Sequence, residues 1–191
     1  MLYWVKHQAK YAYAWHDRTL LGYDRSTLCP QCGRPVLIPK FSADMPDLLL
    51  EGPENYPDFL QFTGAGRQLF LVSERTLELF EENHISGYSG SSLIKVTPPS
   101  HSSRYYKLNI IGSVDLDYSA MHLKKKKLCP HCNQFEWNRM RLDPMLLDDT
   151  TWDGSDLCAL LTFPGFKLCT AAVKELVERY QLTGLLLQSA R

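Results

Sequence analysis

The chain contains 191 residues, of which 45% are hydrophobic, 12% aromatic and 22% charged, and these values exclude a disordered or collagen-like protein. Its 21 Lys and Arg residues balance its 21 Asp and Glu residues, and a net charge of zero argues against nonspecific binding to nucleic acid or to an anionic membrane. The length suffices for one compact domain with a real core, or for two small domains.

The N-terminal segment and the hydropathy pattern predict where the protein works. The sequence has no stretch of about eighteen apolar residues, which argues against a membrane-spanning helix. Residues 1–7 lack the long apolar core of a secretory signal, so we expect a cytoplasmic protein. In that reducing compartment, paired cysteines are typical of metal sites or redox centres rather than of disulfides.

The first cysteine pair is Cys29 and Cys32, separated by Pro30 and Gln31 and followed by Gly33. Cysteines at this spacing present both thiolates from one tight turn. The proline helps to set this turn, and the glycine relieves the backbone where it reverses. The segment therefore has the pattern of a zinc knuckle.

An acidic stretch follows the first cysteine pair. Residues 44–58 contain five acidic residues, including Asp44 and Asp47, and no Lys or Arg. Three prolines in the same stretch disfavour a helix, so we expect a surface loop. Such a loop is either simply solvated or able to dock a basic partner.

A strand–helix–strand unit is predicted next. The apolar run Leu69–Ser73 is typical of a strand, Leu77 and Phe80 lie at helical spacing, and Gly87 precedes another apolar stretch. Ser73 stands at the N-cap position, where its hydroxyl oxygen can accept a hydrogen bond from an amide of the first turn.

The middle of the chain contains a linker and a lysine run. Residues 97–103 include two prolines and predict a linker or long loop, and residues 105–114 are typical of strand material. Four lysines, residues 124–127, lead into the second cysteine pair, Cys129 and Cys132. Such a run is either a solvated surface or, beside a zinc knuckle, a contact for phosphate.

The C-terminal part repeats the earlier pattern. Residues 143–156 again hold five acidic residues, including Asp148 and Asp149, without Lys or Arg. The strand–helix–strand pattern returns 97 residues downstream, with Thr170 at the N-cap position and Gly184 at the closing position. The echo is either a coincidence of two common patterns or an ancient internal duplication, and we interpret it as a duplication.

These elements predict an α+β fold in a single domain, residues 1–191, with two related strand–helix–strand halves at about 1–112 and 113–191. The four paired cysteines suit one structural Zn²⁺ in a zinc-ribbon-like clamp, with the ligands Cys29, Cys32, Cys129 and Cys132. The 96 residues between the pairs are no obstacle, because loop-closure entropy rises only logarithmically with length.

Alternatives to a structural zinc stay open. Plain reduced thiols are one, and thiol–disulfide chemistry at a helix N-terminus is another; Pro35 disrupts a helix at the first pair, whereas the second pair can start one. Cys158 and Cys169 lie in apolar company and are expected to be buried structural thiols. A four-cysteine site leaves no position for a reactive water, and no other motif indicates catalysis, so we expect a protein that is not an enzyme.

The order of these motifs resembles a known family. A segment rich in Tyr and Trp precedes Cys29–Gly33, a Leu-Phe-Leu-Val-Ser-Glu unit follows at residues 69–74, and a second cysteine pair comes before the final helix and Leu182–Leu185. This arrangement is similar to the double-CXXCG motif family of bacterial immunity proteins, known from paralogous sets in myxobacteria. The second motif has Asn133 where the family has glycine.

The resemblance implies an antitoxin-like protein that binds a cognate polymorphic toxin, in some cases a nuclease, and blocks its active site. Acidic loops would then face a basic cleft of the toxin, with Asp44, Asp47, Asp148 and Asp149 as the candidate contacts. The alternative is a zinc-ribbon nucleic-acid-binding protein that uses residues 124–127 and nearby aromatic side chains.

Overall fold

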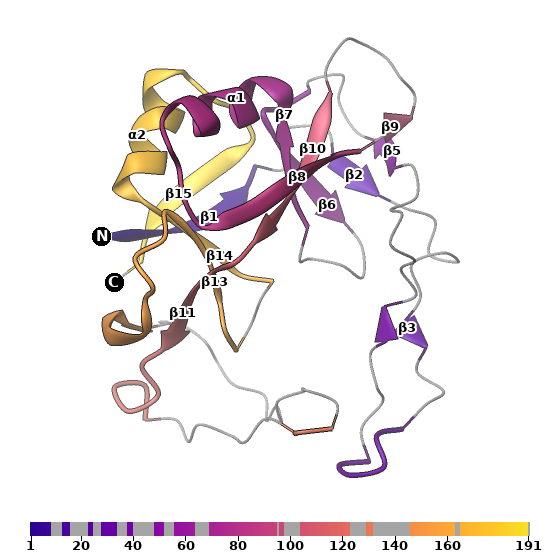
Figure 1. The fold of residues 1–191 in the computed structure, drawn as a ribbon, viewed down its shortest axis with the longest axis vertical. Coiled ribbons are helices and arrows are strands. Elements are labelled where there is room, and N and C mark those ends of the chain that lie inside the picture. Colours follow the sequence, from indigo (N-terminus) through magenta and orange to yellow (C-terminus); the bar gives the residue numbers. More distant parts are fainter. Residues whose placement is uncertain are drawn as a thin grey trace.

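The fold is that of a computed structural model (Figure 1). It describes residues 1–8, 13–15, 23–24, 28–33, 38–39, 48–51, 56–63, 69–94, 96–97, 104–122, 129–131, 146–162 and 165–190. Within these residues two helices and two large, mixed sheets make an α+β fold, which confirms the predicted fold class.

One sheet has six strands in the order β12–β11–β13–β14–β1–β15. Neighbouring strands are antiparallel except for β11 and β13. The N-terminal strand lies between two strands from the end of the chain, so the two termini come close together (Figure 1). The strands are β1 (Leu2–His7), β11 (Gly112–Leu116), β12 (Leu147–Asp148), β13 (Leu157–Leu160), β14 (Lys167–Thr170) and β15 (Leu185–Ser189), and the short helix η1 (Asp149–Thr151) follows β12.

The second sheet has seven strands in the order β8–β10–β7–β6–β2–β5–β9, and a separate ribbon pairs β3 with β4. The predicted strand material at 105–114 is divided: β10 belongs to this sheet and β11 to the other, with a break at Ile111. The strands are β2 (Tyr13–Trp15), β3 (Tyr23–Asp24), β4 (Ile38–Pro39), β5 (Leu48–Glu51), β6 (Phe59–Thr63), β7 (Phe70–Ser73), β8 (Tyr88–Ile94), β9 (Val96–Thr97) and β10 (Tyr105–Ile110).

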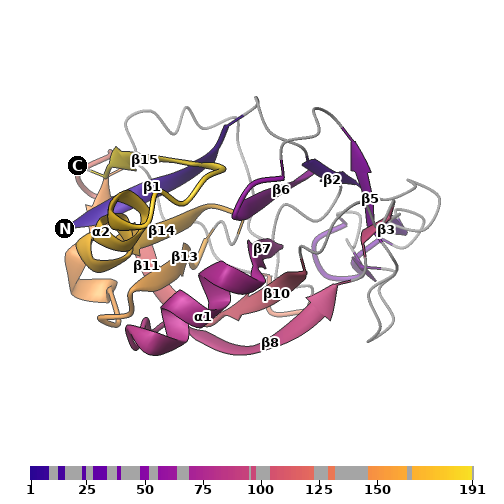
Figure 2. The ribbon, with the colours of Figure 1, turned by 90° about the horizontal axis from the view of Figure 1, so that it is seen from above.

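The helices α1 (Glu74–Glu82) and α2 (Ala171–Arg179) lie together at one end of the long axis (Figures 1 and 2). Each helix ends next to a residue in the left-handed region, His84 with φ 54° and Gln181 with φ 52°. The same kind of closing turn therefore ends both helices. In the described part of the chain, neither helix has the length and apolar character needed to cross a membrane.

The two helix starts differ in their caps. Ser73 accepts a hydrogen bond from the Thr76 amide at 3.2 Å, which confirms its predicted N-cap role. Thr170 also occupies the N-cap position, but its side chain makes no cap hydrogen bond, so that part of the prediction is wrong. Its hydroxyl donates to the Asp156 carboxylate at 2.8 Å, as the Ser73 hydroxyl does to the Asp58 carboxylate at 3.1 Å.

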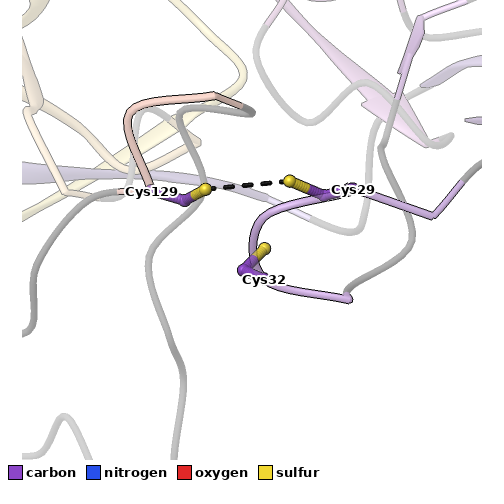
Figure 3. A group of neighbouring side chains, drawn as sticks. All are labelled: Cys29, Cys32 and Cys129. Atoms are coloured by element: carbon purple, nitrogen blue, oxygen red, sulfur yellow. Dashed lines mark hydrogen bonds between the residues drawn. The ribbon is translucent and has the colours of Figure 1, made fainter.

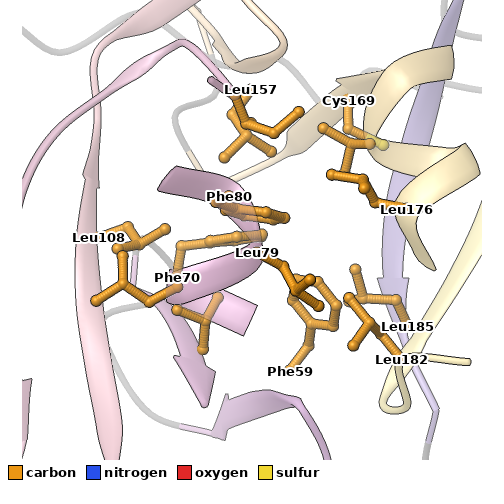
Figure 4. Close-up of a cluster of buried hydrophobic side chains, with 14 residues drawn as sticks. Phe59, Phe70, Leu79, Phe80, Leu108, Leu157, Cys169, Leu176, Leu182 and Leu185 are labelled. Atoms are coloured by element: carbon orange, nitrogen blue, oxygen red, sulfur yellow. The ribbon is translucent and has the colours of Figure 1, made fainter. Parts of the chain in front are cut away.

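One hydrophobic core is shared by both strand–helix–strand units (Figure 4). Side chains from α1 and from α2 contribute to the same cluster, and so do side chains from both sheets. Burial of this shared surface couples the two units energetically. The cluster consists of Phe59, Phe70, Val72, Leu77, Leu79, Phe80, Ile85, Leu108, Leu157, Cys169, Val173, Leu176, Leu182 and Leu185.

Candidate metal centre

Three cysteine sulfurs from two distant turns converge in space (Figure 3). The Sγ atoms of Cys29, Cys32 and Cys129 all lie within 4.8 Å of one another, and their side chains point toward a common space. The sulfurs of Cys29 and Cys129 are 3.7 Å apart. In Figure 1 the segments 28–33 and 129–131 lie at the lower end of the long axis, whereas the helices lie at the upper end.

The sulfur–sulfur distance fits a shared metal ion. Two sulfurs bound at about 2.3 Å and at tetrahedral angles lie about 3.8 Å apart, whereas a disulfide requires about 2.05 Å. The observed 3.7 Å between Cys29 and Cys129 matches the first value. Both of these cysteines are buried, and Cys32 is partly exposed. This group can hold a metal ion, and thiolate donors are of the kind that Zn²⁺ binds well.

The first turn is built as the sequence predicts. The Gly33 amide donates to the Cys29 carbonyl at 2.8 Å, which closes the turn and brings the two cysteine side chains together. Gly33 has φ 68°, and a Cβ atom at this position would meet no atom within 4 Å. The glycine is therefore required for its backbone conformation and not for a close approach.

Of Cys132, the lysine run and His131, the structure describes only His131. Cys132, the fourth predicted ligand, and the lysines 124–127 lie outside the described residues. His131, between the second pair of cysteines, is exposed. The structure thus brings together the three predicted ligands that it describes.

The predicted acidic contacts differ in their surroundings. Asp44 and Asp47 lie outside the described residues. Asp148 is half-buried, and its Oδ1 accepts hydrogen bonds from the Thr150 amide at 3.0 Å and hydroxyl at 2.6 Å, which starts η1. Asp149 is exposed. Asp148 therefore has a local structural role, and Asp149 is the better candidate for a partner contact.

Asp58, in the first acidic stretch, is a buried structural residue that the sequence analysis did not identify. This residue is only 9% exposed, although the sequence placed it in a surface loop. Its Oδ2 accepts hydrogen bonds from the Thr183 amide at 2.9 Å and hydroxyl at 3.1 Å, and its Oδ1 accepts one from the Ser73 hydroxyl at 3.1 Å. The surface expectation is wrong here because three donors replace the water around the carboxylate.

Asp156, in the second acidic stretch, makes the corresponding contacts. Its Oδ2 accepts from the Ser86 amide at 3.0 Å and hydroxyl at 2.8 Å, and its Oδ1 accepts from the Thr170 hydroxyl. Burial acts to raise the pKa of Asp156, but these hydrogen bonds outweigh it, and the pKa falls below the ordinary value. The signal that could have revealed both roles is the spacing, because Asp58 and Asp156 precede the two N-cap residues by 15 and 14 positions.

Asp115, in β11, is a second buried carboxylate, and it binds the turn that follows this strand. Asp115 is 2% exposed, and its Oδ1 accepts hydrogen bonds from the Tyr118 hydroxyl at 3.0 Å and the Thr162 hydroxyl at 2.7 Å. Burial is the main cause that raises the pKa of Tyr118 to about 12. The phenol therefore stays protonated and anchors the turn after β11 to the following hairpin.

Cys158 and Cys169 are buried, as predicted. Each is 0% exposed, and burial above all raises both thiol pKa values to about 12. Thiols with such values stay protonated at neutral pH and are poor nucleophiles and poor metal ligands. They belong to the packing of β13 and β14 and not to the metal centre.

The α+β fold and the three-cysteine cluster define the protein as a mixed-sheet protein with a candidate thiolate metal centre. No protein-family model matches the chain, and no curated protein matches it. The likeness to the immunity-protein family therefore stays a prediction from the sequence motifs.

Proposed function

We propose that this chain is an immunity protein, which binds a cognate toxin in the cytoplasm and neutralises it without catalysing a reaction. The observation that supports this proposal best is the convergence of thiolates from two turns that are 100 residues apart in the chain. We propose that Cys132 completes the ligand set and that the metal is one structural Zn²⁺.

The chemistry of the donor set favours a structural role. A catalytic zinc site keeps one position open for water and uses His or carboxylate ligands, whereas four thiolates close the coordination shell. A closed site fixes the two turns relative to each other and so orders the surface around them. This is the role that a binding protein requires of its metal.

The partner face is proposed to include Asp149 together with Asp44 and Asp47. An exposed carboxylate at η1 attracts a basic surface such as the substrate cleft of a nuclease toxin. Electrostatic attraction of this kind mainly raises the association rate and enforces the choice of partner.

The decisive test uses the neighbouring gene. The adjacent open reading frame is expressed in a sensitive host with the chain, without it, and with a Cys29→Ser/Cys129→Ser variant, and growth is followed. We expect the neighbour to be lethal alone and harmless with the wild-type chain, and the two proteins to co-purify. Undiminished toxicity despite good expression of the chain would contradict the proposal.

The acidic contacts are tested on the purified pair. Replacing Asp149, Asp44 and Asp47 by Asn should slow association at low salt, with a smaller effect at high salt. The matched control is Glu78→Gln/Glu81→Gln/Glu82→Gln, which removes three exposed charges from α1 and should leave association much less affected. An equal effect of both changes would remove the acidic loops from the interface.

The competing function has its own signature. A zinc-ribbon nucleic-acid-binding protein that uses residues 124–127 would be retained on RNA or DNA at low salt and released as salt rises. Retention of that kind, together with a harmless gene neighbour, would replace the immunity proposal.

A further inference from the structure

The two carboxylate contacts are reciprocal. Asp58 lies next to β6 in the first unit and holds Thr183 of the second, whereas Asp156 lies next to β13 in the second unit and holds Ser86 of the first. The amide of each aspartate also hydrogen-bonds the hydroxyl of the residue it holds, at 3.1 Å and 3.0 Å. The same set of three hydrogen bonds thus occurs twice, once in each direction between the units.

The backbone crossings beside these contacts are also reciprocal. A Cβ atom on Gly87 would lie 2.0 Å from the Leu157 carbonyl oxygen, and one on Gly184 would lie 2.3 Å from the Phe59 carbonyl oxygen. The two glycines have φ values of 94° and 98°. Two segments can approach this closely only where no side chain intervenes, and the chain uses the same solution at both crossings.

The first strand of each unit lies in the sheet of the other unit. β10 lies between β7 and β8 of the first unit, and β1 lies between β14 and β15 of the second unit. In the register, Ile110 faces Tyr88 and His7 faces Leu185. The amides that follow these strands then donate to equivalent glycine carbonyls, Ile111 to Gly87 at 2.9 Å and Gln8 to Gly184 at 3.1 Å.

The equivalent positions occur in the same order along the chain. Their separation is 103 residues for β1 and β10, 100 for the cysteine pairs, 98 for the two aspartates and 97 for the two helices. A gradual decrease of this kind is what a few short deletions in one copy of a duplicated segment produce.

We infer that the chain is two copies of one unit, about residues 1–97 and 104–190, that have exchanged their first strands. β1 of the first copy completes the six-stranded sheet, and β10 of the second copy completes the seven-stranded sheet, as in a two-fold dimer with swapped strands. The boundary between the copies lies in the Pro-rich linker and not near residue 112. Each copy is incomplete without the other, because the strand between β7 and β8 and the strand between β14 and β15 each come from the opposite copy.

The metal centre follows the same relation. Cys29 and Cys129 are equivalent positions of the two copies, and their sulfurs face each other at 3.7 Å. Each copy therefore supplies one cysteine turn to a shared site, and the position equivalent to Cys32 belongs to Cys132. This arrangement does not depend on the identity of any toxin.

The strand exchange is tested by cysteine cross-linking in the full-length, metal-loaded protein. Lys6 faces Leu186, and the Asn109 side chain donates to the Ser89 hydroxyl at 3.0 Å; all four residues are exposed. After mild oxidation, the pair Lys6→Cys/Leu186→Cys and the pair Asn109→Cys/Ser89→Cys should each form a disulfide, detected by mass spectrometry of linked peptides. The crossed controls, Lys6→Cys/Ser89→Cys and Asn109→Cys/Leu186→Cys, should not. Disulfides in the crossed pairs alone would mean unexchanged strands and would overturn the inference.

The equivalence of the copies is tested separately by circular permutation. Residue 190 is joined to Met1 by a linker as long as the natural β8–β10 connection, and the chain is opened between Thr97 and Arg104. The permutant then has the same order of elements as the wild type, so it should bind the same amount of Zn²⁺ and unfold within a few degrees of it. A permutant that aggregates or loses the metal would contradict the duplication, whatever the gene-neighbour experiment shows.

Discussion

The Asp156→Ala substitution tests the reciprocal carboxylate contacts most directly. The change removes three hydrogen bonds to an ionised acceptor, from the Ser86 amide, the Ser86 hydroxyl and the Thr170 hydroxyl. Each is worth about 1.5–3 kcal/mol when the acceptor is charged and buried, and the half-exposed position favours the lower end. We expect a loss of about 4–5 kcal/mol in the free energy of unfolding, a large share of the about 5–15 kcal/mol that is typical of a domain.

The assay is equilibrium unfolding in urea with the metal present. Asp58→Ala should cost at least as much, because its carboxylate accepts from three equivalent donors and is more deeply buried. Asp149→Ala is the matched control in the same acidic stretch as Asp156, and as an exposed residue it should change stability by less than about 0.5 kcal/mol. A loss below about 1 kcal/mol for Asp156→Ala, or an equal loss for Asp149→Ala, would refute the reasoning.

The pH dependence of the free energy of unfolding tests the Asp156 contact in a second way. The folded-state pKa of Asp156 lies below its ordinary value of 3.8, so its contribution is present above that pH and is lost as pH falls through the folded-state pKa. The difference in stability between wild type and Asp156→Ala should therefore be constant near neutral pH and shrink in acid. A difference that grows in acid would mean that the carboxylate is protonated in the folded state.

Two further substitutions test individual buried positions. Burial lowers the pKa of His7 from 6.5 to about 4, so the unfolded chain takes up a proton before the folded one does as the pH falls. Wild-type stability should therefore fall by about 3 kcal/mol between those pH values, and His7→Leu should abolish this loss, as measured by urea unfolding at a series of pH values. Gly87→Ala forces a Cβ to within 2.0 Å of a carbonyl oxygen and should cost at least about 3 kcal/mol, whereas Gly154→Ala, with φ 85° and nothing within 4 Å, should cost about 1 kcal/mol; equal midpoints in urea would show that no close crossing exists at Gly87.

The sequence predicted the elements that depend on local chemistry. Hydrophobic periodicity and turn residues predicted the strand that ends at Ser73 and the helix that buries Leu77 and Phe80. The structure confirms both elements. The pairing of Cys29 with Cys129 was also predictable. A structural metal site of this kind takes four ligands, so one cysteine pair needs a second pair, whatever their separation in the chain.

Contacts between the units could not be predicted in the same way. An aspartate in a Pro-rich acidic stretch has the same local pattern whether it is solvated or buried. Asp58 is buried because distant donors on Thr183 and Ser73 satisfy its carboxylate. Strand exchange is equally invisible, because β1 and β10 have the alternation of any strand, and the choice of neighbours is made by long-range pairing.

The position of the metal centre predicts what its removal does. The shared core contains none of the three candidate ligands that the structure describes, and their turns lie at the opposite end of the long axis from the helices that close this core (Figure 1). Although a structural zinc can contribute on the order of 10 kcal/mol to a domain that depends on it, the apolar burial in this core does not require the metal. We therefore expect a chelator to abolish hydrogen-exchange protection in residues 28–33 and 129–131 while the amides of α1 and α2 stay protected.

The matching variants separate metal binding from core packing. Cys129→Ser should lose the metal and reproduce the chelated state. Cys158→Ala should bind as much metal as the wild type and lower the midpoint of core unfolding, because it leaves a cavity where a fully buried side chain stood. Simultaneous loss of protection in the helices on chelation would mean that the metal, and not the buried surface shared by the two units, holds them together. The reciprocal aspartate contacts would then be a consequence of metal binding, and Asp156→Ala would lose its effect once the metal is removed.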